Sequence, residues 1–430
     1  MSHWVRRRAV QSGTTAVVLS GILLSSTWTS LTTVHGNPAH ASLGSRFAGK
    51  TPIVLGELLP FTGPNALRGK DMQLGYNLAV NTVNAAGGVM GRPLKLRGED
   101  TASDPADAVA AAHKVINVDG AQEIVGPATI TGPAILPIAA QSKVPEILVG
   151  GSTQLDKDTN PYYFRTSPSD SQQGVAMAYY ALHRGWKTGA LVFTEQPAAQ
   201  TLKAPIAAAF QRHGGKIVST VDIVPGQSSY RSEIQRIFAN HPQVVFTQLD
   251  EQTAGVLLPE TQQMGDLKVP WLGTNLLDTS DFYKAVGQQI ATSVVYATQG
   301  AASGGIGFSN YLRLYKKAYH TSVIANLSQD CYDSVILMAL AMDYAHSTNG
   351  AAVDRAITKI SNPPGIKVGN YGRGMRLINR HQKINWEGAA TSDDFNRYHN
   401  VFGPFAVLKF QSNGVPKTIA TIPAKALGKF

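Results

Sequence analysis

The chain has 430 residues, of which 43% are hydrophobic, 15% charged and 8% aromatic. This composition is typical of a globular protein with a substantial core and excludes a disordered chain. The formal net charge of +10 comes from the two ends of the sequence. The basic residues of 366–430 are scattered and include no aromatic stacking motif, so we expect a solvated surface there and no nucleic-acid partner.

The first 41 residues have the pattern of an export segment. Three arginines at 6–8 precede an apolar run over 16–24 that is too short to span a bilayer. Ala39-His40-Ala41 fits a small-x-small cleavage site, which would leave a mature chain from Ser42; an uncleaved anchor is the alternative. We therefore expect a signal peptide or export segment over 1–41 and a location in the periplasm or at the cell surface.

Residues 53–100 predict a strand, a helix and a second strand. The apolar run over 53–59 has strand length, and a turn rich in Pro, Gly and Asn follows. Apolar residues then repeat at the spacing of one helix face until Gly87 and Gly88 end the helix. Ligands of parallel sheets bind beyond the carboxyl ends of the strands, so the loop over 60–68 is a candidate ligand loop.

Strands and helices continue to alternate along most of the chain. This alternation predicts parallel sheets covered by helices. Further strands are expected at 123–125, 147–149, 162–165, 190–193, 216–224, 244–247, 271–272 and 294–297, with helices at 309–319, 330–346 and 351–360 near the end. The segment from 366 onward is expected to be rich in strands and turns.

Several motifs, in order along the chain, resemble one known family. They include P-F-T-G-P at 60–64, N-A-A-G-G-V-M-G-R-P-L at 84–94 and Y-F-R-T-S-P-S-D-S-Q-Q-G at 163–174. They are similar to motifs of the type I periplasmic solute-binding proteins, the leucine/isoleucine/valine-binding group of branched-chain amino acid ABC transporters, over about residues 51–425.

This resemblance implies an α/β fold of two Rossmann-like lobes with parallel sheets, joined by a hinge of three crossovers. Lobe 1 would comprise 51–168 and 300–366, and lobe 2 would comprise 169–298 and 367–430. The resemblance also implies that a small polar solute, an amino acid or a small carboxylate, is captured by hinge closure and passed to the membrane permease of an ABC importer.

The resemblance implies a set of ligand positions in the first half of the chain. In amino-acid-binding members, a Ser or Thr of the third-strand loop and an Ala-x-Thr after the fourth strand hold the ligand's carboxylate and amino groups. Thr129 or Thr131, and Gly151 with Thr153, are similar positions here, and Thr62 offers a hydroxyl in the first loop. The alternative is that these threonines cap helices or turns.

The chain departs from this group at two charged positions. The acid that pairs with the ligand's ammonium would fall near Asn275, and Arg68 replaces a common aromatic residue. This exchange favours an anionic carboxylate over a plain amino acid because Arg binds carboxylates bidentately. Arg68 as an exposed helix-start residue is the alternative, and Glu195 or Asp250 could supply the missing negative charge.

No catalytic or metal-binding pattern is recognised. The stretch G-P-N-A-L-R-G-K-D at 63–71 has five residues between its glycines where a P-loop has four, and the eleven histidines show no H-E-x-x-H spacing. We therefore expect no enzyme, no cofactor and no metal. A receptor module for amide or urea-like solutes is the alternative, and an α/β enzyme is less favoured. The single cysteine, Cys331, lies far from the export segment, so no lipoprotein is expected.

Overall fold

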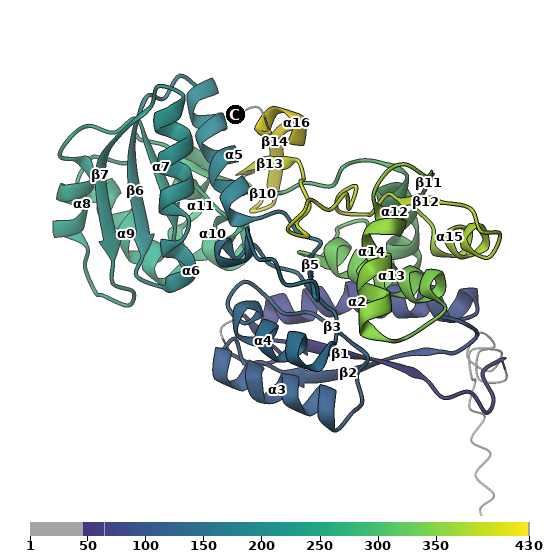
Figure 1. Cartoon of the computed structure of the whole chain (residues 1–430). Coiled ribbons are helices and arrows are strands. Elements are labelled where there is room, and N and C mark those ends of the chain that lie inside the picture. The colour runs from purple at the N-terminus through teal and green to yellow at the C-terminus, as the bar shows by residue number, and fades with distance from the viewer. Residues whose placement is uncertain (1–45, 64, 429–430) are drawn as a thin grey trace, which may run out of the picture. The chain divides into compact units, whose positions relative to one another are not determined.

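The computed structural model describes residues 46–63 and 65–428 (Figure 1). The export segment expected over 1–41 lies outside the described residues. Among the residues described, none of the helices has the length and apolarity that spanning a bilayer requires.

The first sheet has five parallel strands in the order β2-β1-β3-β4-β5. They are β1 (Ile53–Leu59), β2 (Leu94–Asp100), β3 (Glu123–Val125), β4 (Glu146–Leu148) and β5 (Tyr163–Arg165). One face packs on α3 (Pro105–Asn117) and α4 (Gly132–Ser142), and the other packs on α2 (Ala66–Ala86), α12 (Ile306–Tyr319), α13 (Ser328–Ala345) and α14 (Gly350–Ser361). The strand, helix and strand predicted over 53–100 are therefore confirmed as β1, α2 and β2.

Local sequence explains where these helices begin and end. The Asp104 carboxylate accepts hydrogen bonds from the backbone N–H groups of Ala106 and Asp107, at 2.7 and 3.1 Å, and so caps α3 ahead of Pro105. At the end of α2, Gly87 has a φ of 118°, a conformation that glycine adopts without steric cost.

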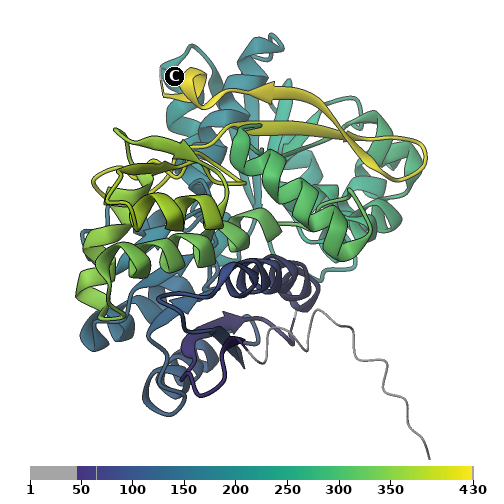
Figure 2. The ribbon, with the colours of Figure 1, turned by 90° about the vertical axis from the view of Figure 1, so that its right-hand side faces the viewer.

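The second sheet has seven strands in the order β14-β13-β10-β9-β8-β6-β7. They are β6 (Thr188–Thr194), β7 (Lys216–Ile223), β8 (Val244–Gln248), β9 (Trp271–Gly273), β10 (Val295–Gly300), β13 (Phe405–Phe410) and β14 (Pro416–Ile422). The antiparallel hairpin of β13 and β14 forms one edge and is the long yellow ribbon pair of Figure 2.

Helices cover both faces of this second sheet as well. One face packs on α5 (Asp170–His183), α7 (Lys203–Arg212) and α16 (Ala424–Leu427), and the other packs on α8 (Arg231–Phe238), α9 (Glu251–Gln263), α10 (Ser280–Val286) and α11 (Gln288–Ser293). The expected fold class, two Rossmann-like lobes built on largely parallel sheets, is confirmed.

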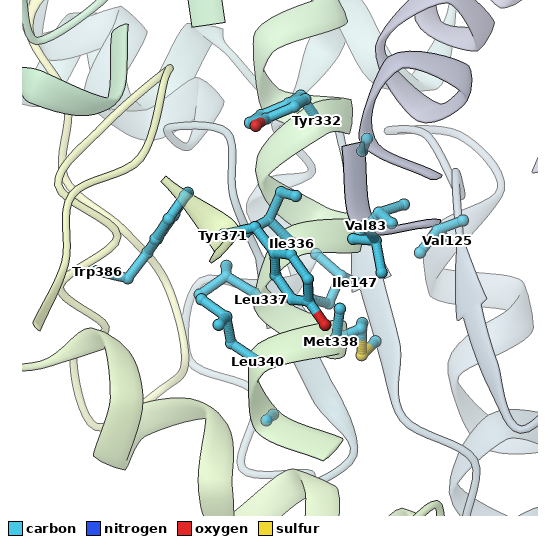
Figure 3. Close-up of a cluster of buried hydrophobic side chains, with 14 of the residues drawn as sticks. Val83, Val125, Ile147, Tyr332, Ile336, Leu337, Met338, Leu340, Tyr371 and Trp386 are labelled. Atoms are coloured by element: carbon cyan, nitrogen blue, oxygen red, sulfur yellow. The ribbon is translucent and has the colours of Figure 1, made fainter. Parts of the chain in front are cut away.

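Helix α13 is the centre of the first core. Every residue from Asp330 to Asp343 is buried, because neighbours surround the helix on all sides. Figure 3 shows Ile336 and other side chains of α13 between Val83 of α2 and the aromatic rings of Tyr371 and Trp386.

The segment over 368–401 packs differently from the lobe boundaries that the resemblance implies. It contains α15 (Tyr371–Ile378) and β12 (Ile384–Trp386), and β12 pairs with the preceding strand β11 (Ile366–Val368). Its apolar side chains belong to the first core. The Tyr371 hydroxyl lies 2.7 Å from a carboxylate oxygen of Asp343 and 3.0 Å from the backbone oxygen of Gly88, and its single hydrogen serves these two acceptors. The chain therefore enters the second sheet only at β13, about 40 residues after the lobe boundary that the resemblance places between 366 and 367.

Candidate functional site

A cavity of about 550 Å³ lies among the carboxyl ends of strands from both sheets. Residues after β1, β3 and β4 line it from the first lobe, and residues at the end of β8 and after β6 and β9 line it from the second. Both sets follow the rule that ligands of open α/β sheets bind beyond the carboxyl ends of their strands. The cavity is also within the size range of small-molecule sites.

The segments that connect the lobes run beside this cavity and are hydrogen-bonded to one another. The side-chain N–H of Gln173, which follows the first crossing, donates to the backbone oxygen of Thr298 at 2.7 Å. The backbone N–H groups of Ala301 and Ser303 donate to the oxygens of Pro404 and Ala390, at 2.8 and 3.0 Å. The three crossings therefore form one connected hinge, a geometry suited to domain closure.

Five of the nine residues expected to bind ligand line the cavity, and four do not. Those that line it are Arg68, Thr129, Thr131, Gly151 and Asn275. The remaining four, all among the described residues, are Thr62, Thr153, Glu195 and Asp250.

The four residues outside the cavity have other surroundings. The Thr62 hydroxyl donates to the Asp100 carboxylate at 2.5 Å, and Thr153 begins a short 3-10 turn. The Asp250 carboxylate accepts from the backbone N–H of Thr253 at 2.8 Å and caps α9, while Glu195 is exposed. Turn formation, the alternative weighed for the threonines, describes Thr153, whereas Thr62 bonds to the side chain of Asp100.

The hydroxyl groups on the first lobe are oriented by the backbone. Thr129 Oγ1 accepts from the N–H of Gly151 at 2.9 Å, and Thr131 Oγ1 accepts from the N–H of Ala128 at 3.1 Å. Each hydroxyl hydrogen then remains available for an acceptor, such as an oxygen of a bound solute.

Gly151 occupies a position that no other residue fits. A Cβ atom there would lie 1.7 Å from a carboxylate oxygen of Asp170. The Asp170 N–H also donates to the Gly151 oxygen at 2.8 Å. The glycine thus lets the hinge acid Asp170 lie directly against the loop after β4, where it lines the cavity.

Arg68 brings a positive charge to the cavity. Within residues 46–63 and 65–428, no hydrogen bond or ion pair engages its guanidinium. Burial lowers the pKa of Arg68, and the charges of Asp278 and Asp170 oppose that effect. A partly desolvated guanidinium with no direct partner is a suitable group for a solute carboxylate.

Two acids near Arg68 were not identified from the sequence. Burial raises the pKa of Asp170 to about 6 and that of Asp278 to about 7, and the positive charge of Arg68 lowers both. Asp170 lies directly after the first crossing, and this position is the only sequence signal for its role. The same stretch also predicts a turn and a helix cap, so the sequence does not distinguish the two. Asp170 therefore lines the cavity, whereas Glu195 and Asp250, the acids considered from the sequence, do not.

The described residues hold no group of three or more His, Cys, Asp or Glu side chains arranged to bind a metal ion. The polar groups of the cavity are instead hydroxyls, carboxamides, one guanidinium and carboxylates. Groups of these kinds are suited to binding and orienting a small polar solute.

Comparisons with known proteins agree with this architecture. A family model described as periplasmic binding protein matches residues 52–385. The chain is 24% identical over 363 residues to the chemotactic signal transduction system substrate-binding protein BasB of Halobacterium salinarum, covering 80% of this chain and 83% of that protein. It is 25% identical over 323 residues to Leu/Ile/Val-binding protein homolog 3 of Brucella melitensis, covering 74% of this chain and 86% of that protein.

A similar solved structure is that of a leucine binding protein, LivK, from Thermotoga maritima. The TM-score is 0.72 at 21% identity, and the match covers 86% of this chain and 99% of that one. At this identity the match shows the shared fold.

Proposed function

The chain belongs to the periplasmic binding protein family, and we propose that it captures a small carboxylate-bearing solute between its two lobes and delivers it to the permease of an ABC importer. Capture proceeds by hinge closure, and the solute favours the closed form only through its higher affinity for that form. Neither the BasB protein, which is named for a chemotactic signal transduction system, nor the Brucella protein, which is named for Leu/Ile/Val binding, is named for amide or urea-like solutes, so these comparisons do not favour the receptor-module alternative.

One observation carries the carboxylate part of the proposal. Arg68 lines the cavity without a direct partner among the described residues, and the hydroxyls of Thr129 and Thr131 line the same cavity. A guanidinium with two hydroxyl donors is a complete recognition set for one carboxylate.

The presence of Asp170 keeps amino acids within the proposed solute class. Its carboxylate lines the cavity that Arg68 also lines, and the two charges interact. A zwitterion can therefore satisfy both charges, in keeping with the Leu/Ile/Val-binding name of one relative. A solute without an ammonium group would leave the Asp170 carboxylate with only the positive charges of Arg165 and Arg68 acting on it.

The experiment is thermal unfolding of the purified protein with branched-chain amino acids, aliphatic and aromatic carboxylates, amides and urea. A solute at about 100 times its dissociation constant stabilises the folded state by about 2.7 kcal/mol, enough for a clear rise in melting temperature. We expect carboxylates or amino acids to give that rise, and Arg68→Ala to abolish it.

The matched control is Lys70→Ala, which removes an exposed positive charge from the same helix. It should leave the rise unchanged. Stabilisation by neutral amides alone, or stabilisation by carboxylates that survives Arg68→Ala, contradicts the proposal.

We also propose that the segment over 1–41 directs export and is removed. The family is extracytoplasmic, which supports this assignment. N-terminal sequencing of the protein recovered from the extracytoplasmic fraction should begin at Ser42; recovery of an intact Met1 from the membrane fraction would favour an uncleaved anchor.

A further inference from the structure

The second lobe presents uncharged carboxamide groups to the cavity. Gln196, Gln248 and Asn275 each stand at or just after the carboxyl end of a strand, β6, β8 and β9 respectively, and all three line the cavity. These strands are direct neighbours in the sheet. Adjacent strands lie about 4.8 Å apart, so the three side chains form a row about 10 Å long.

The side chains of this carboxamide row have no hydrogen-bond partners among the residues that the structure describes. Of the other carboxamides that line the cavity, Asn65 donates to Ser103 and Gln173 donates to Thr298, whereas Gln299, Asn326 and Gln329 also have no side-chain partner among the described residues. The row differs from these three in being built on the ends of adjacent strands of one sheet. Gln248 and Asn275 are half-buried and Gln196 is exposed. A half-buried carboxamide offers one acceptor and two donor hydrogens, and leaving them unpaired costs free energy. The row is thus complementary to groups that both donate and accept without carrying charge.

The acids on these same strand-end loops do not line the cavity. Asp250 is engaged in capping α9, and Glu195 is exposed. The lining from these three loops is therefore neutral, whereas the ionisable groups of the lining, Arg68, Asp170 and Asp330, come from other segments.

The size of the cavity agrees with a solute that reaches from the charged groups to this row. A volume of about 550 Å³ lies well inside the range that holds drug-sized ligands. A free branched-chain amino acid has no polar group left for the carboxamide row once its carboxylate and ammonium are bound.

Building on the proposed function, we propose that the solute is a carboxylate with at least one uncharged amide or hydroxyl group, of the size of a dipeptide or an acylated amino acid. The carboxylate binds Arg68, and the neutral group binds the carboxamide row of Gln196, Gln248 and Asn275. Amide-bearing solutes fit best, since a peptide group supplies a donor and an acceptor at once.

The test is titration calorimetry of the full chain with five probes that share a carboxylate. Isovalerate has the carboxylate alone, L-valine adds an ammonium, N-acetyl-L-valine adds an amide, L-alanyl-L-valine adds both, and gluconate adds hydroxyls. One neutral hydrogen bond gives about a fivefold gain in affinity, so two bonds should make N-acetylvaline or alanylvaline bind at least about tenfold tighter than isovalerate and valine.

The key variant is Gln248→Met, which removes the carboxamide and keeps the side-chain length. It should reduce the affinity for N-acetylvaline and alanylvaline about fivefold more than it reduces the affinity for isovalerate. Gln196→Met, at an exposed position, repeats the test should Gln248→Met lower the melting temperature of the unliganded protein. Gln262→Met is the control, since Gln262 is exposed on α9 and does not line the cavity.

The outcomes separate the two proposals. If isovalerate or valine binds more tightly than N-acetylvaline and alanylvaline, and Gln248→Met has no selective effect, the role of the carboxamide row is overturned. The carboxylate site then remains in place. If Gln248→Met lowers the affinity for gluconate and not the affinity for the amide probes, the row is supported with hydroxyl groups as its partners. Binding that persists in Arg68→Ala, or no binding of any probe, overturns both proposals.

Discussion

Glu57 in the middle of β1 is a buried acid that should make the stability of the protein depend on pH. Its side chain is 2% exposed, one carboxylate oxygen has no hydrogen-bond partner among the described residues, and the other accepts only a long bond of 3.4 Å from Gln73. Burial raises the pKa of Glu57 from 4.5 to about 7, and the bond from Gln73 offsets part of that rise. We predict that Glu57→Gln stabilises the protein at pH 8.

The magnitude follows from linkage. Below about pH 4.5 the carboxyl is protonated in both the folded and the unfolded state, so it contributes no pH dependence. Between pH 4.5 and about 7 the unfolded state releases its proton while the folded state retains it, so the free energy of unfolding falls as the pH rises. Above pH 7 the ionised carboxylate destabilises the fold by about 3 kcal/mol, the equivalent of this pKa shift.

The assay is urea unfolding of the wild type and of Glu57→Gln at pH 4.5 and pH 8. The variant should be more stable than the wild type by up to about 3 kcal/mol at pH 8 and about equal to it at pH 4.5. Glu195→Gln is the control, because Glu195 is exposed and its replacement should change stability by less than about 0.5 kcal/mol. A Glu57→Gln variant that is destabilised equally at both pH values would refute the reasoning and indicate a charged, well-solvated Glu57.

Three further substitutions test the hinge, the first core and a helix cap. Gly151→Ala should destabilise the protein by about 1–3 kcal/mol in thermal unfolding, because the new Cβ would overlap the Asp170 carboxylate. Gly300→Ala is the control and should be neutral, since its Cβ would lie 3.7 Å from the nearest atom. Equal losses of stability in the two variants would contradict this account. Tyr371→Phe should cost about 1–3 kcal/mol in urea unfolding by leaving a buried acceptor without its donor, and an unchanged midpoint would show that the 368–401 segment does not depend on this bond. Asp104→Ala should cost about 1 kcal/mol in the same assay through loss of the α3 cap; no change would mean that water replaces the cap.

The sequence was most informative where periodicity and turn residues agree. The apolar run of β1, the 21-residue helix α2 and its Gly87 ending all appear where expected, because each element has its own local signal. The segment over 368–401 has no comparable signal, since its place in the first core depends on contacts such as Tyr371 with Gly88, more than 280 residues apart.

The site shows the same division between local and long-range information. Arg68, Thr129 and Gly151 could be proposed because loops at strand ends meet at one edge of a sheet. Asp170 was missed because its role depends on Gly151 lying against it, which no sequence pattern reports. Whether the Asp250 carboxylate caps its own helix or enters the cavity likewise depends on side-chain orientation, which strand-end position alone does not determine.

The most direct test of the central claim is a crystal structure of the protein with the panel solute that raises its melting temperature most. We predict a solute between the two lobes with its carboxylate within hydrogen-bonding distance of the Arg68 guanidinium and the Thr129 hydroxyl. A solute bound outside this cavity, or one bound inside it with Arg68 turned away from its carboxylate, would contradict the account.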